Sequence, residues 1–459
     1  MAGVFAASLH AAAFEAADIL AIPWHDFVFR PQLSVQSTFT DNLFYGNDST
    51  TTPVIFRPVI VVGNTAQFGP ITTNNVVLRR QETDLITTVS PGLQIQYGAP
   101  AGNKINLNYQ YDEVVYLQHP YANAPQTHIT AATIFDSGSF SLRGADQIHF
   151  LSSLLGGGSG SGVLGLVVNR RTWDDVYYLR LEVSEKTSIY AKALHSDTDY
   201  DPGTPIFDYN TVSGTLGASY NPAAKLALTV ESSYGQTSVT DNSPQRQKSP
   251  HSQFMTANIG AKGEFTPKIE GSVKVGVESR SFPGLADPHS TTSPAFDVAI
   301  TYNASLKTVI TLNYSRRTDI SGNYGAQSLS DNTVSLTVQE WLGPTGMWSL
   351  IGRTSGSMRD FSSVQIPIPI LATDARGNLL FDSTGRAVTT SVSGDYARSE
   401  TIISFGIQLN YQPRPWLTAS LYYDFSQYSS HFNDTRVGSL HPFIDYVDNR
   451  ATFRIGIGF

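Results

Sequence analysis

Apolar and polar residues alternate one by one through most of the chain, which is the pattern of β-strands rather than of helices. Near the C-terminus, Phe453, Ile455 and Ile457 share one face, and Arg454 and Gly456 share the other. The same alternation recurs in residues 105–111, 212–220, 226–230, 296–302, 403–411 and 417–425. The pattern predicts an all-β protein whose sheet contacts an apolar medium on one face and water on the other.

Short and long connections alternate between the predicted strands. Tight turns are expected at residues 98–103, 184–186, 221–225, 266–268, 303–306, 342–346 and 412–415. Long segments rich in Gly, Ser and Asp separate them, at residues 41–82, 156–171, 280–293, 359–397 and 429–446. Soluble sandwiches and propellers also alternate, but short turns at one rim and long loops at the other are typical of a transmembrane antiparallel up-and-down β-barrel.

The pattern predicts about 18 strands, with 16 as the alternative count. The fourth and fifth strands, placed at residues 128–142 and 146–155, are the least distinct. Residues 27–459 are expected to form one barrel, and residues 1–26 a signal-like or flexible N-terminal segment. Residues 3–13 are small and apolar, like part of a signal peptide, but no Lys or Arg precedes Arg30, so the sequence leaves both interpretations open.

Composition narrows the function classes. The 459 residues carry a formal net charge of −8, so a nucleic-acid-binding surface is not expected. Cysteine is absent, which excludes disulfides, thiolate metal sites and thiol nucleophiles. No run reaches the roughly 18 apolar residues of a membrane-spanning helix. The mean hydropathy of −0.14 is the average expected of a wall that faces lipid on one side and water on the other.

Aromatic residues precede the short turns at one position in each hairpin. We expect them to form an interfacial girdle, where amphipathic rings are favoured. They are Tyr97, Tyr220, Phe265, Tyr302, Trp341 and Tyr411.

Charged residues on the polar faces of the strands are the candidate lumen-facing residues. Both signs are present, which favours neutral polar solutes such as sugars over strong ion selectivity. The alternative is that these charges only solvate an aqueous interior. They are Lys104, Asp112, Glu231, Lys274, Glu278, Arg280, Asp297, Asp424 and Arg454.

No motif for catalysis, a cofactor or a metal stands out. The ten His residues show no HExxH spacing and no close pair on one face. The acidic run from Asp197 to Asp201 lacks the Gly and the distal Glu of a calcium loop. We therefore expect no enzyme, cofactor or metal site. The alternative is a hydrolase with a Ser/His pair facing the lipid at the rim.

The chain resembles the β-barrel porins of Gram-negative bacteria that are associated with exopolysaccharide gene clusters. The matching segments are PQLSVQSTFTDNLF (Pro31–Phe44), ETDLITTVSPGLQIQY (Glu82–Tyr97), the hairpins with an aromatic residue before the turn and a Lys after it, and the terminal RIGIGF. The resemblance implies a Gram-negative outer-membrane location and a link to polysaccharide export. It also implies that the C-terminal residues of the chain act as the signal read by the barrel assembly machinery. These residues are Tyr446, Phe453, Ile455, Ile457 and Phe459.

The sequence thus predicts a porin-like outer-membrane channel with short periplasmic turns and long extracellular loops. Expected partners are outer-membrane lipids, lipopolysaccharide, the barrel assembly machinery and polysaccharide export components. Lipopolysaccharide phosphates are expected to bind at Arg170-Arg171 and Arg316-Arg317. The first alternative is a structural or adhesive barrel that conducts nothing, and the second is the rim-located hydrolase. Whether residues 43–80 or 359–397 plug the lumen is left open.

Overall fold

The computed structural model describes residues 21–43, 59–62, 65–68, 82–99, 102–154, 167–201, 207–241, 252–283, 290–320, 328–344, 346–361, 365–371, 389–395, 398–432 and 445–458. Within these ranges the chain is built almost entirely of strands, and its one helical element is the three-residue 3-10 helix η1 (Pro120–Ala122). The part of the chain that the structure describes holds no helix with the length and hydrophobicity of a membrane-spanning segment.

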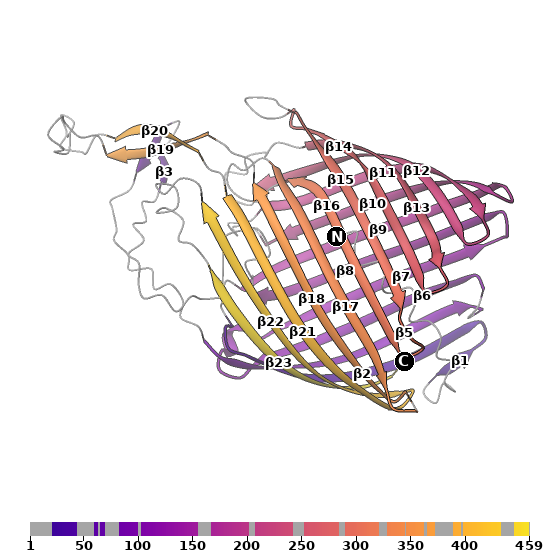
Figure 1. The fold of residues 1–459 in the computed structure, drawn as a ribbon. Coiled ribbons are helices and arrows are strands. Elements are labelled where there is room, and N and C mark those ends of the chain that lie inside the picture. Colours follow the sequence, from indigo (N-terminus) through magenta and orange to yellow (C-terminus); the bar gives the residue numbers. More distant parts are fainter. Residues whose placement is uncertain are drawn as a thin grey trace.

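Eighteen antiparallel strands close into one barrel (Figure 1), which confirms the predicted fold and strand count. Each strand pairs with the next along the chain. The strands are β2 (Phe27–Thr40), β5 (Asp84–Gly98), β6 (Lys104–Tyr116), β7 (Ala124–Asp136), β8 (Phe140–Leu154), β9 (Val167–Ser184), β10 (Thr187–Tyr200), β11 (Phe207–Ala223), β12 (Leu226–Asp241), β13 (Ser252–Thr266), β14 (Ile269–Ser281), β15 (Ser290–Asn303), β16 (Thr308–Ile320), β17 (Ser328–Leu342), β18 (Trp348–Phe361), β21 (Arg398–Arg414), β22 (Leu417–Phe432) and β23 (Tyr446–Ile457).

The first and last barrel strands pair with each other and close the sheet. β2 pairs with β23 from Leu33 opposite Ile457 to Thr40 opposite Arg450, and with β5 along its other edge. The hydroxyls of Thr38 and Thr452 are 2.9 Å apart across this seam. Closure leaves no barrel strand with an unpaired edge, which is the condition for placing a sheet in lipid.

Short turns lie at one rim and long connections at the other, as predicted. One boundary was predicted wrongly: the turn between the fourth and fifth barrel strands lies at residues 137–139 rather than 143–145. Gly138 makes this turn with a φ of 86°, a conformation that favours glycine. The apolar alternation continues across residues 140–145, because these residues belong to β8 rather than to a turn, with Leu142 opposite Phe135.

Two short hairpins lie within the longest loops. β3 (Val59–Val62) pairs with β4 (Thr65–Phe68), and β19 (Gln365–Leu371) pairs with β20 (Thr389–Asp395). Figure 1 shows β3, β19 and β20 beyond the long-loop rim rather than within the barrel. The remainder of both loops, including most of 43–80 and of 359–397, lies outside the described residues.

A third short strand precedes the barrel. β1 (Ile22–Trp24) pairs only with β2, across a turn in which His25 has a φ of 57°. The segment predicted to be signal-like or flexible therefore contains a strand at residues 22–24, and the barrel proper begins at Phe27. Residues 1–20 of this segment lie outside the described residues.

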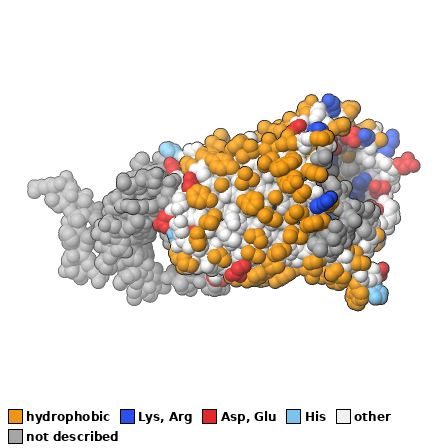
Figure 2. All heavy atoms as spheres, turned by 90° about the horizontal axis from the view of Figure 1, so that it is seen from below, with side chains coloured by type: hydrophobic (Ala, Val, Ile, Leu, Met, Phe, Trp, Pro, Cys, Tyr) orange, Lys and Arg blue, Asp and Glu red, His pale blue; other side chains and the backbone are white. Residues whose placement is uncertain are grey.

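The two faces of the wall differ in chemistry. Hydrophobic side chains are spread over the whole wall of the barrel in view, whereas charged side chains lie mainly toward its two ends (Figure 2). Leu216 in β11 and Ile259 in β13, for example, are 72% and 62% exposed. Because successive side chains of a strand point to opposite faces, their neighbours Thr215 and Asn258 point inward.

The aromatic residues at the short-turn rim follow the prediction with one correction. Tyr97, Tyr220, Phe265 and Tyr302 lie near the ends of their strands and are exposed. Trp341 lies opposite Ser349 in β18, whereas its neighbour Leu342 lies opposite the exposed Trp348, so Trp341 is on the inner face. Trp348 takes its place on the outside and stacks on Tyr411 with ring centroids 4.3 Å apart.

Candidate functional site

The polar inner wall is the candidate functional site, and Glu231 lies at its most connected point. Glu231 in β12 is 8% exposed. Its Oε1 lies 2.9 Å from Lys274 Nζ in β14, and its Oε2 lies 3.3 Å from Lys192 Nζ in β10. Asp297 in β15 stands opposite Lys274 in register and so lies on the same face. Charges of both signs therefore lie on the same face across the six neighbouring strands β10 to β15.

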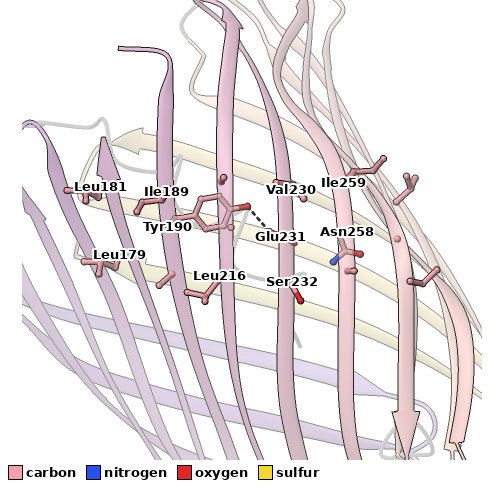
Figure 3. Close-up of a pocket in the computed structure, with 17 residues that line it drawn as sticks. Leu179, Leu181, Ile189, Tyr190, Leu216, Val230, Glu231, Ser232, Asn258 and Ile259 are labelled. Carbon is pink, nitrogen blue, oxygen red and sulfur yellow. Dashed lines mark hydrogen bonds between the residues drawn. The ribbon is translucent and has the colours of Figure 1, made fainter. Parts of the chain in front are cut away.

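A glycine makes room for this cluster. The Tyr190 hydroxyl in β10 donates a hydrogen bond of 3.0 Å to Glu231 Oε2, two strands away (Figure 3). The ring crosses the intervening strand β11 at Gly217, where an added Cβ would lie 2.3 Å from the ring. Only a residue without a side chain fits under the ring, so Gly217 leaves the space through which Tyr190 reaches the carboxylate.

An apolar groove of about 950 Å³ lies over the same strands (Figure 3). The exposed residues that line it belong to the outer face, so the groove opens away from the lumen. Its lining includes Leu179, Leu181, Ile189, Leu216, Val230 and Ile259. These side chains are apolar, as is expected of a surface in contact with the hydrocarbon of a bilayer. The groove is therefore part of the apolar outer belt of the barrel.

Glu278 and Arg280 were predicted to face the lumen, and the structure shows them buried on the polar face of β14. Arg280 Nε lies 3.1 Å from Glu278 Oε1, and both side chains are about 5% exposed. Arg280 also donates to Ser252 Oγ at 3.0 Å and to the Thr318 carbonyl at 2.8 Å. The Phe254 ring lies 4.8 Å from the guanidinium carbon. These contacts hold neighbouring strands together near the long-loop rim.

The other predicted lumen residues also lie on polar faces. Asp112 accepts a hydrogen bond of 2.7 Å from Gln110 Nε2. Arg454 is exposed and lies 3.5 Å from Ser34 Oγ across the seam. Asp424 stands opposite Arg450 in register and is exposed. Lys104 begins β6 beside a short turn and is half-buried.

The structure contains a histidine pair on the inner wall that the sequence did not predict. His128 in β7 and His149 in β8 stand opposite each other, with their Nδ1 atoms 2.7 Å apart. The expectation that no two histidines form a close pair on one face is therefore wrong. The residues are 21 positions apart, and only the β7–β8 register, which depends on the turn at Gly138, brings them together.

A third histidine lies in a polar cluster on the outer face. His195 shares a face with the exposed Val212, and its Nδ1 lies 3.2 Å from Asp175 Oδ2. Its Nε2 lies 3.2 Å from the Asn210 amide. Within the described residues both ring nitrogens thus contact groups other than a hydroxyl, unlike the predicted Ser/His arrangement of a hydrolase.

The acidic run after His195 is satisfied by basic and amide groups rather than arranged as a calcium loop. Arg171 Nη2 lies 3.2 Å from Asp197 Oδ2 and also bonds Asp199. Asn169 Nδ2 donates to Asp201 Oδ2 at 2.7 Å. Arg171, which was predicted to contact lipopolysaccharide phosphates, is thus engaged by two carboxylates of its own chain.

The residues predicted to form the barrel-assembly signal divide between the two faces of β23. Phe453, Ile455 and Ile457 are 49%, 41% and 40% exposed on the outer face. Tyr446 is buried and stacks on Tyr428 with ring centroids 5.4 Å apart. Phe459 lies outside the described residues.

His119 joins two carboxylates at the long-loop rim. It lies in the β6–β7 connection, with Nδ1 2.8 Å from Asp84 Oδ2 and Nε2 2.6 Å from Glu82 Oε2. Burial lowers the pKa of His119, but the hydrogen bonds and charges of Asp84 and Glu82 outweigh it and raise the pKa above its usual value. The protonated imidazole therefore tethers this connection to the start of β5.

This tether predicts a pH dependence. Because the folded pKa of His119 is raised, the stabilisation is fully present below the unfolded pKa of about 6.5 and is lost as pH rises through the folded value. We expect hydrogen exchange in residues 117–123, corrected for intrinsic rates, to be about fivefold faster at pH 8.5 than at pH 5.5, or about 1 kcal/mol. His119→Gln should abolish the difference, and equal protection of the wild type at both pH values would contradict it.

The sequence matches no protein-family model and no curated protein. Among solved structures it is similar to Acinetobacter baumannii OccAB3, with 10% identity, a TM-score of 0.44 and coverage of 94% of this chain and 99% of that one. It is also similar to Pseudomonas aeruginosa OpdK with vanillate, with 9% identity, a TM-score of 0.44 and coverage of 94% of this chain and 99% of that one. Pseudomonas aeruginosa OccK2 (OpdF) has 8% identity, a TM-score of 0.44 and coverage of 94% of this chain and 98% of that one.

The class of the protein follows from its own strand order and surfaces. An 18-stranded antiparallel sheet closes on itself, is apolar outside and carries charges of both signs inside. Short turns at one rim and long loops at the other complete the architecture of a transmembrane up-and-down β-barrel.

Proposed function

We propose that this protein is an outer-membrane channel of a Gram-negative bacterium, through whose lumen small polar solutes cross. The observation that carries the proposal is the closed barrel with an apolar outer face and a charged inner wall. An 18-stranded barrel is wide enough to leave an aqueous interior. A wall of this polarity is suited to water and dissolved solutes rather than to a packed apolar core.

The orientation follows from the layout of the rims. β2 begins and β23 ends at the short-turn rim, as is usual for bacterial barrels whose short turns face the periplasm. The long connections would then face the exterior. Lipids and lipopolysaccharide would surround the outer belt, and the barrel assembly machinery would read β23, whose outer face presents Phe453, Ile455 and Ile457.

The mixed charge of the wall supports neutral polar cargo, of which sugars are the class we favour. Glu231 lies between two lysines, and Asp297 faces Lys274, so no single sign dominates this part of the wall. The resemblance to barrels associated with exopolysaccharide genes supports a role in polysaccharide export, with export components as partners.

Reconstitution tests the channel function directly. The folded protein, added to a planar phospholipid bilayer in KCl, should produce stepwise conductance increases, and vesicles containing it should swell in solutions of small sugars. Detergent alone and heat-unfolded protein serve as controls. Folded barrels that insert without conductance steps would instead support the structural or adhesive alternative. Swelling that ceases above disaccharide size would argue against polysaccharide as cargo.

A further inference from the structure

The histidine pair of the inner wall has an arrangement that imidazole metal sites use. Gln110, His128 and His149 stand side by side in register on β6, β7 and β8, so their side chains share the inner face. The Nδ1 atoms of the two histidines are 2.7 Å apart and their ring planes meet at 62°. Both rings therefore direct a nitrogen at the same point.

A carboxylate fixes the outer nitrogen of one ring. Asp112 Oδ2 lies 3.2 Å from His128 Nε2, and Gln110 Nε2 holds the other carboxylate oxygen at 2.7 Å. The carboxylate accepts the Nε2–H hydrogen of His128, so the neutral ring carries its lone pair on Nδ1. His149 Nδ1–H then donates to that lone pair. Metal-binding histidines commonly have such a carboxylate on the nitrogen away from the metal.

We propose that His128 and His149 bind one divalent transition-metal ion of the Cu²⁺, Ni²⁺ or Zn²⁺ class on the inner wall of the barrel. The ion takes the position between the two Nδ1 atoms, and the His149 proton moves from Nδ1 to Nε2, so both rings bind as neutral imidazoles and no net proton is released. Tetrahedral coordination at 2.0–2.1 Å needs the two nitrogens about 3.3 Å apart, which is a separation of about 0.6 Å more than in the empty pair. The described residues contain no group of three or more His, Cys, Asp or Glu side chains that could hold a metal ion, and the proposed site uses the two imidazoles as its protein ligands.

The ion would be a soft or borderline one. Imidazole nitrogen suits Cu²⁺, Ni²⁺ and Zn²⁺, with the highest affinity expected for Cu²⁺, whereas Mg²⁺ and Ca²⁺ prefer oxygen ligands. The site is reachable from the lumen, since the His128 side chain is 24% exposed and Asp112 is 14% exposed. Metal binding at this site does not depend on whether the lumen conducts.

Electron paramagnetic resonance with Cu²⁺ tests the site on the full folded barrel in detergent. One equivalent of Cu²⁺ should give a spectrum with hyperfine splitting from two nitrogens, and calorimetry at about pH 8 in two buffers of different ionisation enthalpy should report no net proton release. His128→Asn and His149→Asn should each abolish the two-nitrogen signal. Asp112→Asn should weaken binding by about 10–100-fold while keeping both nitrogens.

His195→Asn is the matched control, because His195 also contacts a carboxylate but lies on the outer face. It should leave the spectrum unchanged. Heat-modifiable gel migration verifies that each variant is folded. A two-nitrogen signal that persists in both inner-wall variants, a signal lost in His195→Asn, or no stoichiometric Cu²⁺ binding by the folded wild type would each overturn the proposal.

Discussion

Replacing Ile259 by arginine is expected to destabilise the folded barrel in a phospholipid bilayer by about 2–4 kcal/mol, the range for a cation near the bilayer midplane. Ile259 is 62% exposed on the outer face and lies at the middle of β13. The charged group would have to leave water for hydrocarbon or distort the bilayer around it. Equilibrium unfolding by guanidinium chloride in phospholipid vesicles measures the change.

The neighbouring residue provides the control. Asn258 points to the inner wall beside Glu231, so Asn258→Arg places the same charge in lumen water and should change the free energy of unfolding by less than about 1 kcal/mol. Equal losses for both variants would contradict the assignment of the two faces. A loss at Asn258 with none at Ile259 would reverse it.

The second large effect concerns Glu231, whose removal leaves two lysines facing one another. Glu231→Gln should lower the free energy of unfolding by about 2 kcal/mol, less than for a fully buried pair because lumen water screens the lysines. The same change makes the wall more positive, so the channel should shift toward anion selectivity. The reversal potential in a KCl gradient reports the shift, and urea unfolding reports the stability.

The opposite change at the same cluster is the matched comparison. Lys192→Met combined with Lys274→Met removes both cations from Glu231 and should shift the reversal potential toward cation selectivity. Tyr190→Phe removes only the hydrogen bond to Glu231 and should leave selectivity unchanged. Reversal potentials that do not differ between the two charge variants would show that this part of the wall does not line the conducting path.

The fold was predictable because the alternation of apolar and polar residues is a property of single strands. The alternation within each strand identifies its apolar and polar faces, and the lengths of the connections identify the two rims. The number of strands can therefore be predicted without knowing which residues are in contact. The error at residues 143–145 has a local cause. Gly144, an outer-face residue opposite Tyr177, looks like a turn residue in sequence, whereas Gly138 is the glycine that needs a positive φ.

The pairings within the site were less predictable, because they depend on register between strands. Asp112, His128 and His149 come from three strands, and a shift of one residue would have placed the imidazoles on opposite faces. The same holds for Tyr190, which contacts Glu231 only because Gly217 stands between them. A sequence shows which residues face inward but not which inward residues meet.

The seam between β2 and β23 has a consequence for how the molecule assembles. Its pairs join residues more than 400 positions apart, as in the hydrogen bond between Thr38 and Thr452, at a separation of 414. Loop closure on that scale is slow, and until it happens the growing sheet keeps two reactive edges. Pairing of β23 with β2 removes both free edges and with them the tendency of the sheet to aggregate. We therefore expect no stable barrel to form until β23 is paired.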